Sequence, residues 1–113
     1  MIMTISKALD NPLITVIDRN DDPGIVIFQL GKIVTPITIE IIREDENKYS
    51  LDVSHRMRQS ENHTSSLPAF RNCKTPGDAV HELVQDFDRL YSDMLETSVP
   101  GPSWLEQNPY FNF

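Results

Sequence analysis

Thr75-Pro76-Gly77-Asp78 marks the start of a helix and decides the fold of this chain. The Thr75 hydroxyl suits an N-cap, where it accepts a hydrogen bond from a backbone N–H that would otherwise have no partner. Pro76 suits the first helical position, and Asp78 places negative charge at the positive end of the helix dipole. Residues before this stretch have the patterns of strands and turns, so the sequence predicts a sheet followed by a helix.

Apolar residues recur at steps of three and four after Asp78, as they do on one face of a helix. They are Val80, Leu83, Phe87, Leu90 and Met94, with Val84, Tyr91 and Leu95 widening the stripe. We expect this helix, residues 75–97, to bury the stripe by lying across the sheet. Val99-Pro100-Gly101-Pro102 ends it, because proline cannot continue the helical hydrogen bonds.

Residues 13–74 contain the predicted strands and loops. Four runs have the composition or alternation of strands: 13–17, 25–30, 33–43 and 48–58. Gly31-Lys32 favours a tight hairpin, and Pro36 places its strand end on an edge or a bulge. Ile25–Leu30 is apolar on both faces, so we expect the aromatic tail or the N-terminus to cover part of the second face.

The predicted fold is α+β, with a largely antiparallel four-stranded sheet followed by one long C-terminal amphipathic helix packed on it, plus an irregular aromatic tail at 98–113. Residues 1–113 are expected to form one domain, since 113 residues suffice for one core. Residues 1–10 are compatible with a short helix or an edge strand. An uncovered strand edge near Leu13 or Pro36 leaves a homodimer open.

Composition and charge restrict the partners. The net charge is −7, which disfavours general binding to nucleic acid or anionic membrane, because both need clustered Lys and Arg. We therefore expect no direct nucleic-acid contact and no membrane contact. A lone cysteine, Cys73, and an N-terminus without a secretory pattern indicate a cytoplasmic protein.

Much of the negative charge falls on the predicted outer face of the helix. That face has six acidic residues and a single cation, Arg89. The acids are Asp78, Glu82, Asp86, Asp88, Asp93 and Glu96. A solvated face is the usual explanation of such a run, but its concentration also suits a basic protein partner. Glu82, Asp86 and Asp93 are the predicted contacts.

The tail supplies the other predicted contacts, Trp104, Tyr110 and Phe111. Two interpretations compete: the tail folds back to cover the core, or it docks a partner with its aromatic side chains as anchors.

The alternative function is a small domain that binds an anionic ligand. It would use Arg56, Arg58 and Arg71, which lie near the predicted start of the helix in the most basic part of the chain. No catalytic residues are assigned and an enzyme is not favoured, because no recognisable catalytic constellation is present. The histidines and Cys73 fit no zinc spacing, so no metal and no cofactor is predicted.

Asn72-Cys73-Lys74-Thr75-Pro76-Gly77-Asp78-Ala79, with the amphipathic helix after it, resembles the strand-to-helix junction of HicB-type antitoxin domains. The glycine that the family has before the cysteine is absent here. We attribute the resemblance to shared helix-start chemistry and assign no family.

The sequence therefore favours a small acidic cytoplasmic protein that binds and regulates other proteins. A more specific hypothesis is an inhibitor of a nucleic-acid-handling protein, a role that small phage or mobile-element proteins can have.

Overall fold

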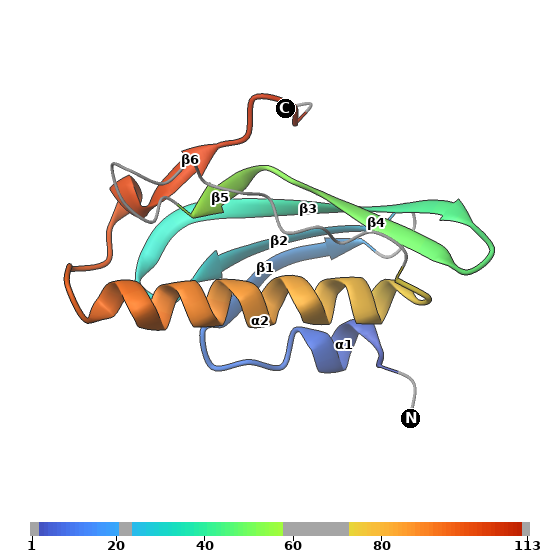
Figure 1. Cartoon of the computed structure of the whole chain (residues 1–113), viewed down its shortest axis with the longest axis horizontal. Helices are drawn as coiled ribbons and strands as arrows, with labels where there is room; N and C mark the ends of the chain where they lie inside the picture. Colours follow the sequence, from blue (N-terminus) through green and yellow to red (C-terminus); the bar gives the residue numbers. More distant parts are fainter. Residues whose placement is uncertain (1–2, 21–23, 58–72, 112–113) are drawn as a thin grey trace.

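A four-stranded antiparallel sheet with a long helix packed on it forms the core of the molecule, which confirms the predicted fold class (Figure 1). The computed structural model describes residues 3–20, 24–57 and 73–111. The strands follow sequence order: β1 (Ile14–Asn20), β2 (Ile25–Leu30), β3 (Ile33–Asp45) and β4 (Lys48–Val53). The remaining elements are α1 (Ile5–Ala8), β5 (His55–Met57), α2 (Pro76–Leu95), the 3-10 turn η1 (Pro102–Trp104) and β6 (Leu105–Gln107).

The long helix α2 begins where the sequence predicts. The Thr75 hydroxyl accepts a hydrogen bond from the Asp78 backbone N–H at 3.1 Å, and Pro76 is the first helical residue. The helix ends at Leu95, two residues before the predicted end. Leu95 was expected to widen the apolar stripe, but it is 49% exposed because the buried stripe stops one turn earlier.

The core lies between α2 and one face of the sheet. Phe87 of α2 meets Phe28 of β2 edge to face, with ring centroids 6.1 Å apart. The strand positions that face the helix are buried: Val26, Phe28, Leu30, Ile33, Ile37, Ile39 and Val53. The helix contributes Val80, Leu83, Val84, Phe87 and Leu90 to the same cluster. Burial of these apolar side chains is the main favourable term holding helix and sheet together.

The second face of β2 is not covered as expected. Ile25, Ile27 and Gln29 alternate with the buried residues of this strand and are only half-buried. The N-terminal segment instead forms α1, which packs against α2, and the tail places Trp104 against Tyr91 of α2. α1 and Trp104 therefore add to the helix side of the sheet, whereas the strand after Trp104, β6, pairs with β5.

The hairpin between β2 and β3 forms at Gly31-Lys32, as predicted. Gly31 has a φ of 56°, a left-handed conformation that glycine adopts without strain. The Lys32 backbone N–H donates to the Tyr91 hydroxyl at 3.0 Å, so this turn is tied to α2. Pro36 lies where the register of β2 and β3 shifts between Phe28 and Leu30, which confirms the predicted irregularity.

A polar break at Ser54 divides the strand expected over 48–58 into β4 and β5. β5 pairs antiparallel with β6, so the tail contains a strand and a 3-10 turn where irregular structure was expected. Asn108 fixes the end of this pair. Its backbone N–H donates to the Ser54 carbonyl at 2.8 Å, and its Nδ2 donates to the Val53 carbonyl at 2.9 Å. Residues 58–72, which belong to the region of predicted strands and loops, lie outside the described residues.

The N-terminal segment packs on the first turn of α2. Of the two alternatives for residues 1–10, the structure has the helix, α1, which is capped by the Thr4 hydroxyl accepting from the Lys7 backbone N–H at 3.1 Å. A Cβ on Gly77 would overlap the backbone of Met3 and Thr4. Gly77 is therefore needed for the close approach of this segment to the helix.

We expect Gly77→Ala to lower the free energy of unfolding by on the order of 2 kcal/mol, because the added methyl meets backbone that must move. Alanine's higher helix propensity would by itself stabilise α2 by about 1 kcal/mol, so a net loss isolates the clash. Gly101→Ala is the matched control, since no atom lies within 4 Å of its Cβ position. Urea unfolding of the three proteins checks this, and equal stability for both variants would contradict it.

Candidate interaction surface on α2

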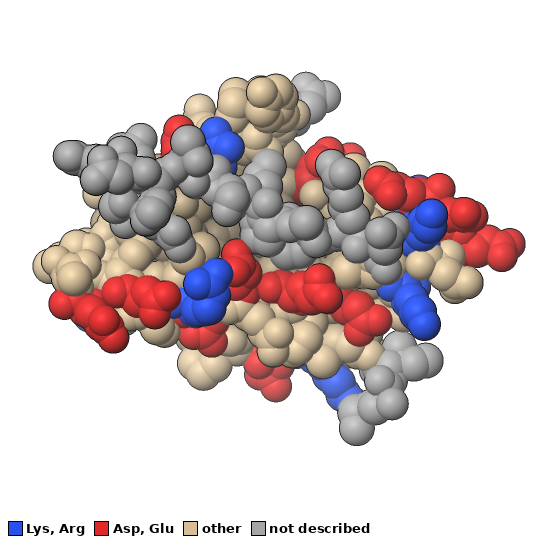
Figure 2. All heavy atoms as spheres, viewed as in Figure 1, with Lys and Arg blue, Asp and Glu red and all other residues tan. Residues whose placement is uncertain are grey.

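The predicted partner contacts Glu82, Asp86 and Asp93 lie on the side of α2 that turns away from the buried stripe. We call these three residues the α2 acidic ridge. Figure 2 shows acidic side chains along the length of this helix, with a basic side chain near the middle. Glu82 is exposed, and the side chains of Asp86 and Asp93 are 25% and 67% exposed. Three carboxylates are thus available on one rigid element.

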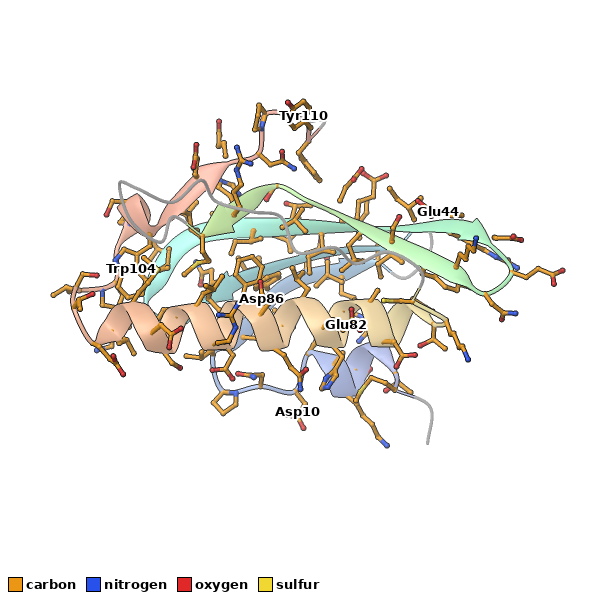
Figure 3. The ribbon with its side chains drawn as sticks, in the orientation of Figure 1. Asp10, Glu44, Glu82, Asp86, Trp104 and Tyr110 are labelled. Carbon is orange, nitrogen blue, oxygen red and sulfur yellow. The ribbon has the colours of Figure 1, made fainter. Side chains whose placement is uncertain are left out.

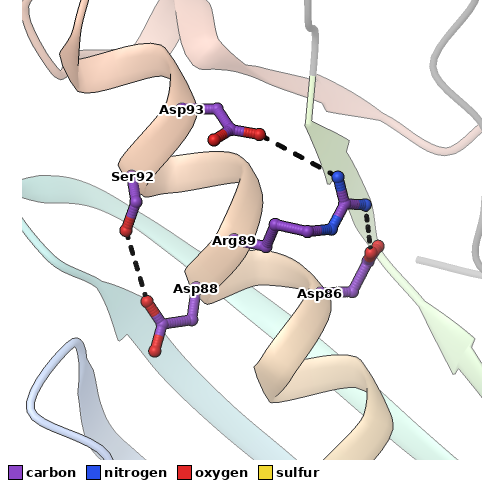
Figure 4. Close-up of polar contacts among 5 residues, drawn as sticks. All are labelled: Asp86, Asp88, Arg89, Ser92 and Asp93. Atoms are coloured by element: carbon purple, nitrogen blue, oxygen red, sulfur yellow. Dashed lines mark hydrogen bonds and ion pairs between the residues drawn. The ribbon is translucent and has the colours of Figure 1, made fainter.

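Arg89 is the cation within this surface (Figure 4). It lies 2.7 Å from an Asp86 oxygen and 3.9 Å from an Asp93 oxygen. The hydrogen bond with Asp86 and the charge of that residue raise the pKa of Arg89. Exposed ion pairs contribute little to stability, and the Arg89 side chain is 61% exposed. A basic partner therefore loses little by displacing Arg89 from these carboxylates.

Asp88, which was predicted to lie on the outer face of the helix with the ridge residues, does not lie beside them. It is half-buried on another side of α2, where its Oδ2 accepts from Asn11 Nδ2 at 3.0 Å. The Ser92 hydroxyl donates to its other oxygen at 3.4 Å (Figure 4). Two residues along a helix turn a side chain by roughly 200°, so Asp88 points away from Asp86. Its role is to hold the segment between α1 and β1.

A shallow, open hollow of about 320 Å³ lies along the ridge. It is lined by Glu82, Gln85, Asp86 and Arg89. Gln85 was not among the predicted contacts, although its position three residues after Glu82 places it on the same face. The hollow is large enough for the end of a long side chain, and its lining supplies carboxylate and amide oxygens.

The predicted tail contacts do not form one surface with the ridge. Trp104 is 4% exposed and packs edge to face on Tyr91, with ring centroids 5.3 Å apart, so it is part of the core and we leave it out of the surface. Tyr110 is 87% exposed, and Phe111 is half-buried. Tyr110 lies at the edge of the molecule away from α2, far from Glu82 and Asp86 (Figure 3).

The residues of the alternative ligand site are described only in part. Arg56 is half-buried on β5, where it stands opposite Glu106 of β6. An acid of the same chain therefore neighbours it, which weakens it as an anion-binding group. Arg58 and Arg71 lie outside the described residues.

Ser54 and His55 contact each other as a catalytic serine and histidine would, but Ser54 is not exposed to solvent. The Ser54 Oγ lies 2.7 Å from His55 Nδ1, and it also accepts from the Thr38 backbone N–H at 2.8 Å. Ser54 is 1% exposed, so its oxygen is inaccessible to a substrate. The pair belongs to the polar network that joins β4, β5 and the tail.

The described part of the chain shows neither a metal cluster nor a membrane-spanning helix. Among those residues, no group of three or more His, Cys, Asp or Glu side chains is arranged to hold a metal ion. None of the helices there combines the length and the apolar composition needed to cross a lipid bilayer.

Comparison of the chain with protein-family models, with curated proteins and with solved structures found no match.

Cys73, at the end of the ridge, is a protonated thiol. Burial, followed by the charge of Glu82, raises its pKa to about 11, and its Sγ donates to Glu82 Oε2 at 3.5 Å. We expect the native protein at about pH 8 to react with a disulfide reagent on the order of a hundredfold more slowly than the urea-unfolded chain. Glu82→Gln should speed the native reaction, because it removes a negative charge beside the thiol. Equal rates for native and unfolded chains would contradict this account.

His55 makes stability depend on pH. Burial lowers its pKa from the ordinary 6.5, so the fold favours the neutral imidazole. Its contribution is complete above the ordinary value and is lost as the pH falls through the lower, folded-state pKa. Between about pH 7.5 and about pH 5, each unit of that shift costs up to about 1.4 kcal/mol. We expect the free energy of unfolding to fall less over this range in His55→Gln than in the wild type. Identical pH profiles would refute the assignment.

Proposed function

We propose that this protein is a small, acidic, cytoplasmic binding protein that regulates a basic protein partner through the α2 acidic ridge. The main support for this proposal is that the three acids of the ridge project from a helix whose other side is packed in the core. Carboxylates held on a rigid element need little ordering when a partner binds, so more of the interaction energy appears as affinity.

The chemistry of the ridge favours a partner that presents Lys or Arg. A guanidinium that enters the hollow would meet Glu82, Asp86 and the amide of Gln85. It would replace Arg89 at Asp86 and could make paired hydrogen bonds to the carboxylate. A Lys ammonium would gain the same attraction with less geometric selectivity.

Proteins that handle nucleic acid are the partner class we favour. Their binding surfaces concentrate Lys and Arg to neutralise phosphates. A row of carboxylates along a helix offers such a surface a competing set of negative charges, so its occupation would inhibit nucleic-acid binding. No observation among the described residues favours the anionic-ligand alternative to the same degree.

The test compares two triple variants with the same change in net charge. Glu82→Lys, Asp86→Lys and Asp93→Lys reverse the ridge, whereas Glu44→Lys, Asp45→Lys and Glu46→Lys reverse the exposed acids at the β3–β4 turn. The partner is captured from a lysate of the natural host with the wild type, identified by mass spectrometry and purified. We expect the ridge variant to bind it on the order of a hundredfold more weakly, because opposed charges replace matched ones.

The turn variant should bind almost as the wild type does, because Glu44 lies away from Glu82 and Asp86 (Figure 3). Circular dichroism and urea unfolding of both variants establish that the fold is intact. If the two variants lose affinity equally, only net charge matters and the ridge is not the site. If neither loses affinity, the proposed function is wrong.

A further inference from the structure

The sheet has a second face, turned away from α1 and α2, on which isoleucines stand among carboxylates. In the register of the sheet, Ile25 pairs with Glu40 and Ile27 pairs with Thr38. Since successive strand residues point to opposite faces, these side chains lie opposite to the buried ones. Within the ranges that the structure describes, no helix lies over this face (Figure 1).

We call this surface the outer sheet face and define it by Asp18, Ile25, Ile27, Glu40 and Asp52. Asp18 pairs with Ile27, and Asp52 pairs with Glu40. The three acids are exposed, and the two isoleucines are half-buried between neighbouring strands. The surface therefore has an apolar centre on β2 with a carboxylate beside each isoleucine.

Isoleucine at two successive outward positions of an inner strand departs from the usual pattern. An antiparallel sheet with one face in water alternates apolar and polar residues, whereas β2 is apolar on both faces from Ile25 to Phe28. Ile17 extends the apolar area, since it is 52% exposed in the register shift of β1 beside Asp18.

The charge of the outer sheet face selects among possible occupants. The paired positions on this face from Thr15–Gln29 to Ile42–Ser50 hold neither Lys nor Arg, and Lys48, at the far end of β4, is paired with an acid, Asp45. A second copy of the chain would bring its own carboxylates against Asp18, Glu40 and Asp52, which is repulsive. A segment that is apolar on one side and basic along its margins complements the face in both respects.

We propose that the outer sheet face docks an amphipathic helix of a partner protein. The apolar stripe of that helix covers Ile25 and Ile27, and its flanking Lys or Arg residues meet Asp18, Glu40 and Asp52. This is helix-in-groove chemistry applied to an open sheet. The site is separate from the α2 acidic ridge and does not rest on the function proposed for it.

The experiment uses the full chain with the ridge already reversed by Glu82→Lys, Asp86→Lys and Asp93→Lys, so that the ridge cannot attract the probe. The probe is a synthetic leucine–lysine helix of about 18 residues, or about five turns, and its control is a scrambled peptide of the same composition. We expect amide shifts in nuclear magnetic resonance spectra to concentrate in β2 and β3, and only the amphipathic peptide should cause them.

Two variants of the same background localise the site. Ile25→Thr with Ile27→Thr keeps the β-branched side chains but removes apolar area, and should weaken binding about tenfold. Glu40→Lys with Asp52→Lys leaves the isoleucines in place and should also weaken it about tenfold, with a reduced dependence on salt. The control, Leu95→Gln with Val99→Thr, removes exposed apolar residues elsewhere and should leave affinity unchanged.

Three outcomes overturn the proposal. The first is equal binding by the scrambled peptide, which would mean attraction by charge alone. The second is unchanged affinity in both site variants. The third is a wild-type dimer in sedimentation that Ile25→Thr with Ile27→Thr dissociates, which would make a second copy the occupant. None of these outcomes bears on the ridge, which the proposed function tests separately.

Discussion

The packing of α2 on one face of the sheet, with Phe87 against Phe28, is the constraint on which the rest of the structure depends. It fixes the rotation of the helix about its own axis, because the apolar stripe occupies only one side. This rotation places the α2 acidic ridge on the side of the helix that is turned away from the core. The same contact requires Tyr91 to reach the β2–β3 turn, where its hydroxyl accepts from Lys32. An apolar interaction thus positions both the charged surface and a polar anchor of the sheet.

The tail shows how a second, polar interaction completes what apolar burial begins. Trp104 closes the end of the core beside Tyr91, but an indole alone would not fix the strand that follows. Asn108 does so, because its side chain and backbone bond to the carbonyls of Val53 and Ser54 in the break between β4 and β5. Buried polar groups cost free energy unless each one is hydrogen-bonded. The polar network that joins β4, β5 and the tail therefore favours this one arrangement. His55 belongs to the same polar network, and its burial there makes its protonation unfavourable.

The sequence predicted the elements whose signals are local and missed the contacts that join distant segments. Thr75 and Pro76 indicate a helix start by their own chemistry, and Gly31 indicates a turn by its conformational freedom. Both predictions are confirmed.

The roles of Asp88 and Trp104 could not be predicted in this way. Their roles depend on Asn11 and Tyr91, which are remote in sequence or on another element, and no pattern of spacing identifies such partners. Of the candidate surface, the ridge acids were readable from helical period, whereas the burial of Trp104 was not. The pattern of β2 correctly indicated an inner strand, but the predicted cover of its second face was wrong, because α1 and Trp104 pack against α2 and β6 pairs with β5.

The two proposed surfaces have one electrostatic property in common that bears on self-association. The ridge presents carboxylates on the helix side, and the register of the sheet places Asp18, Glu40 and Asp52 on its opposite side. Contact between two copies through either surface would bring like charges together, and contact between the ridge of one copy and the sheet of another would do the same. Like charges on both surfaces therefore oppose self-association through them, which is why both proposals name a basic partner. On the outer sheet face, each isoleucine that would attract a second copy is paired with or lies beside a carboxylate that would repel the acids of that copy.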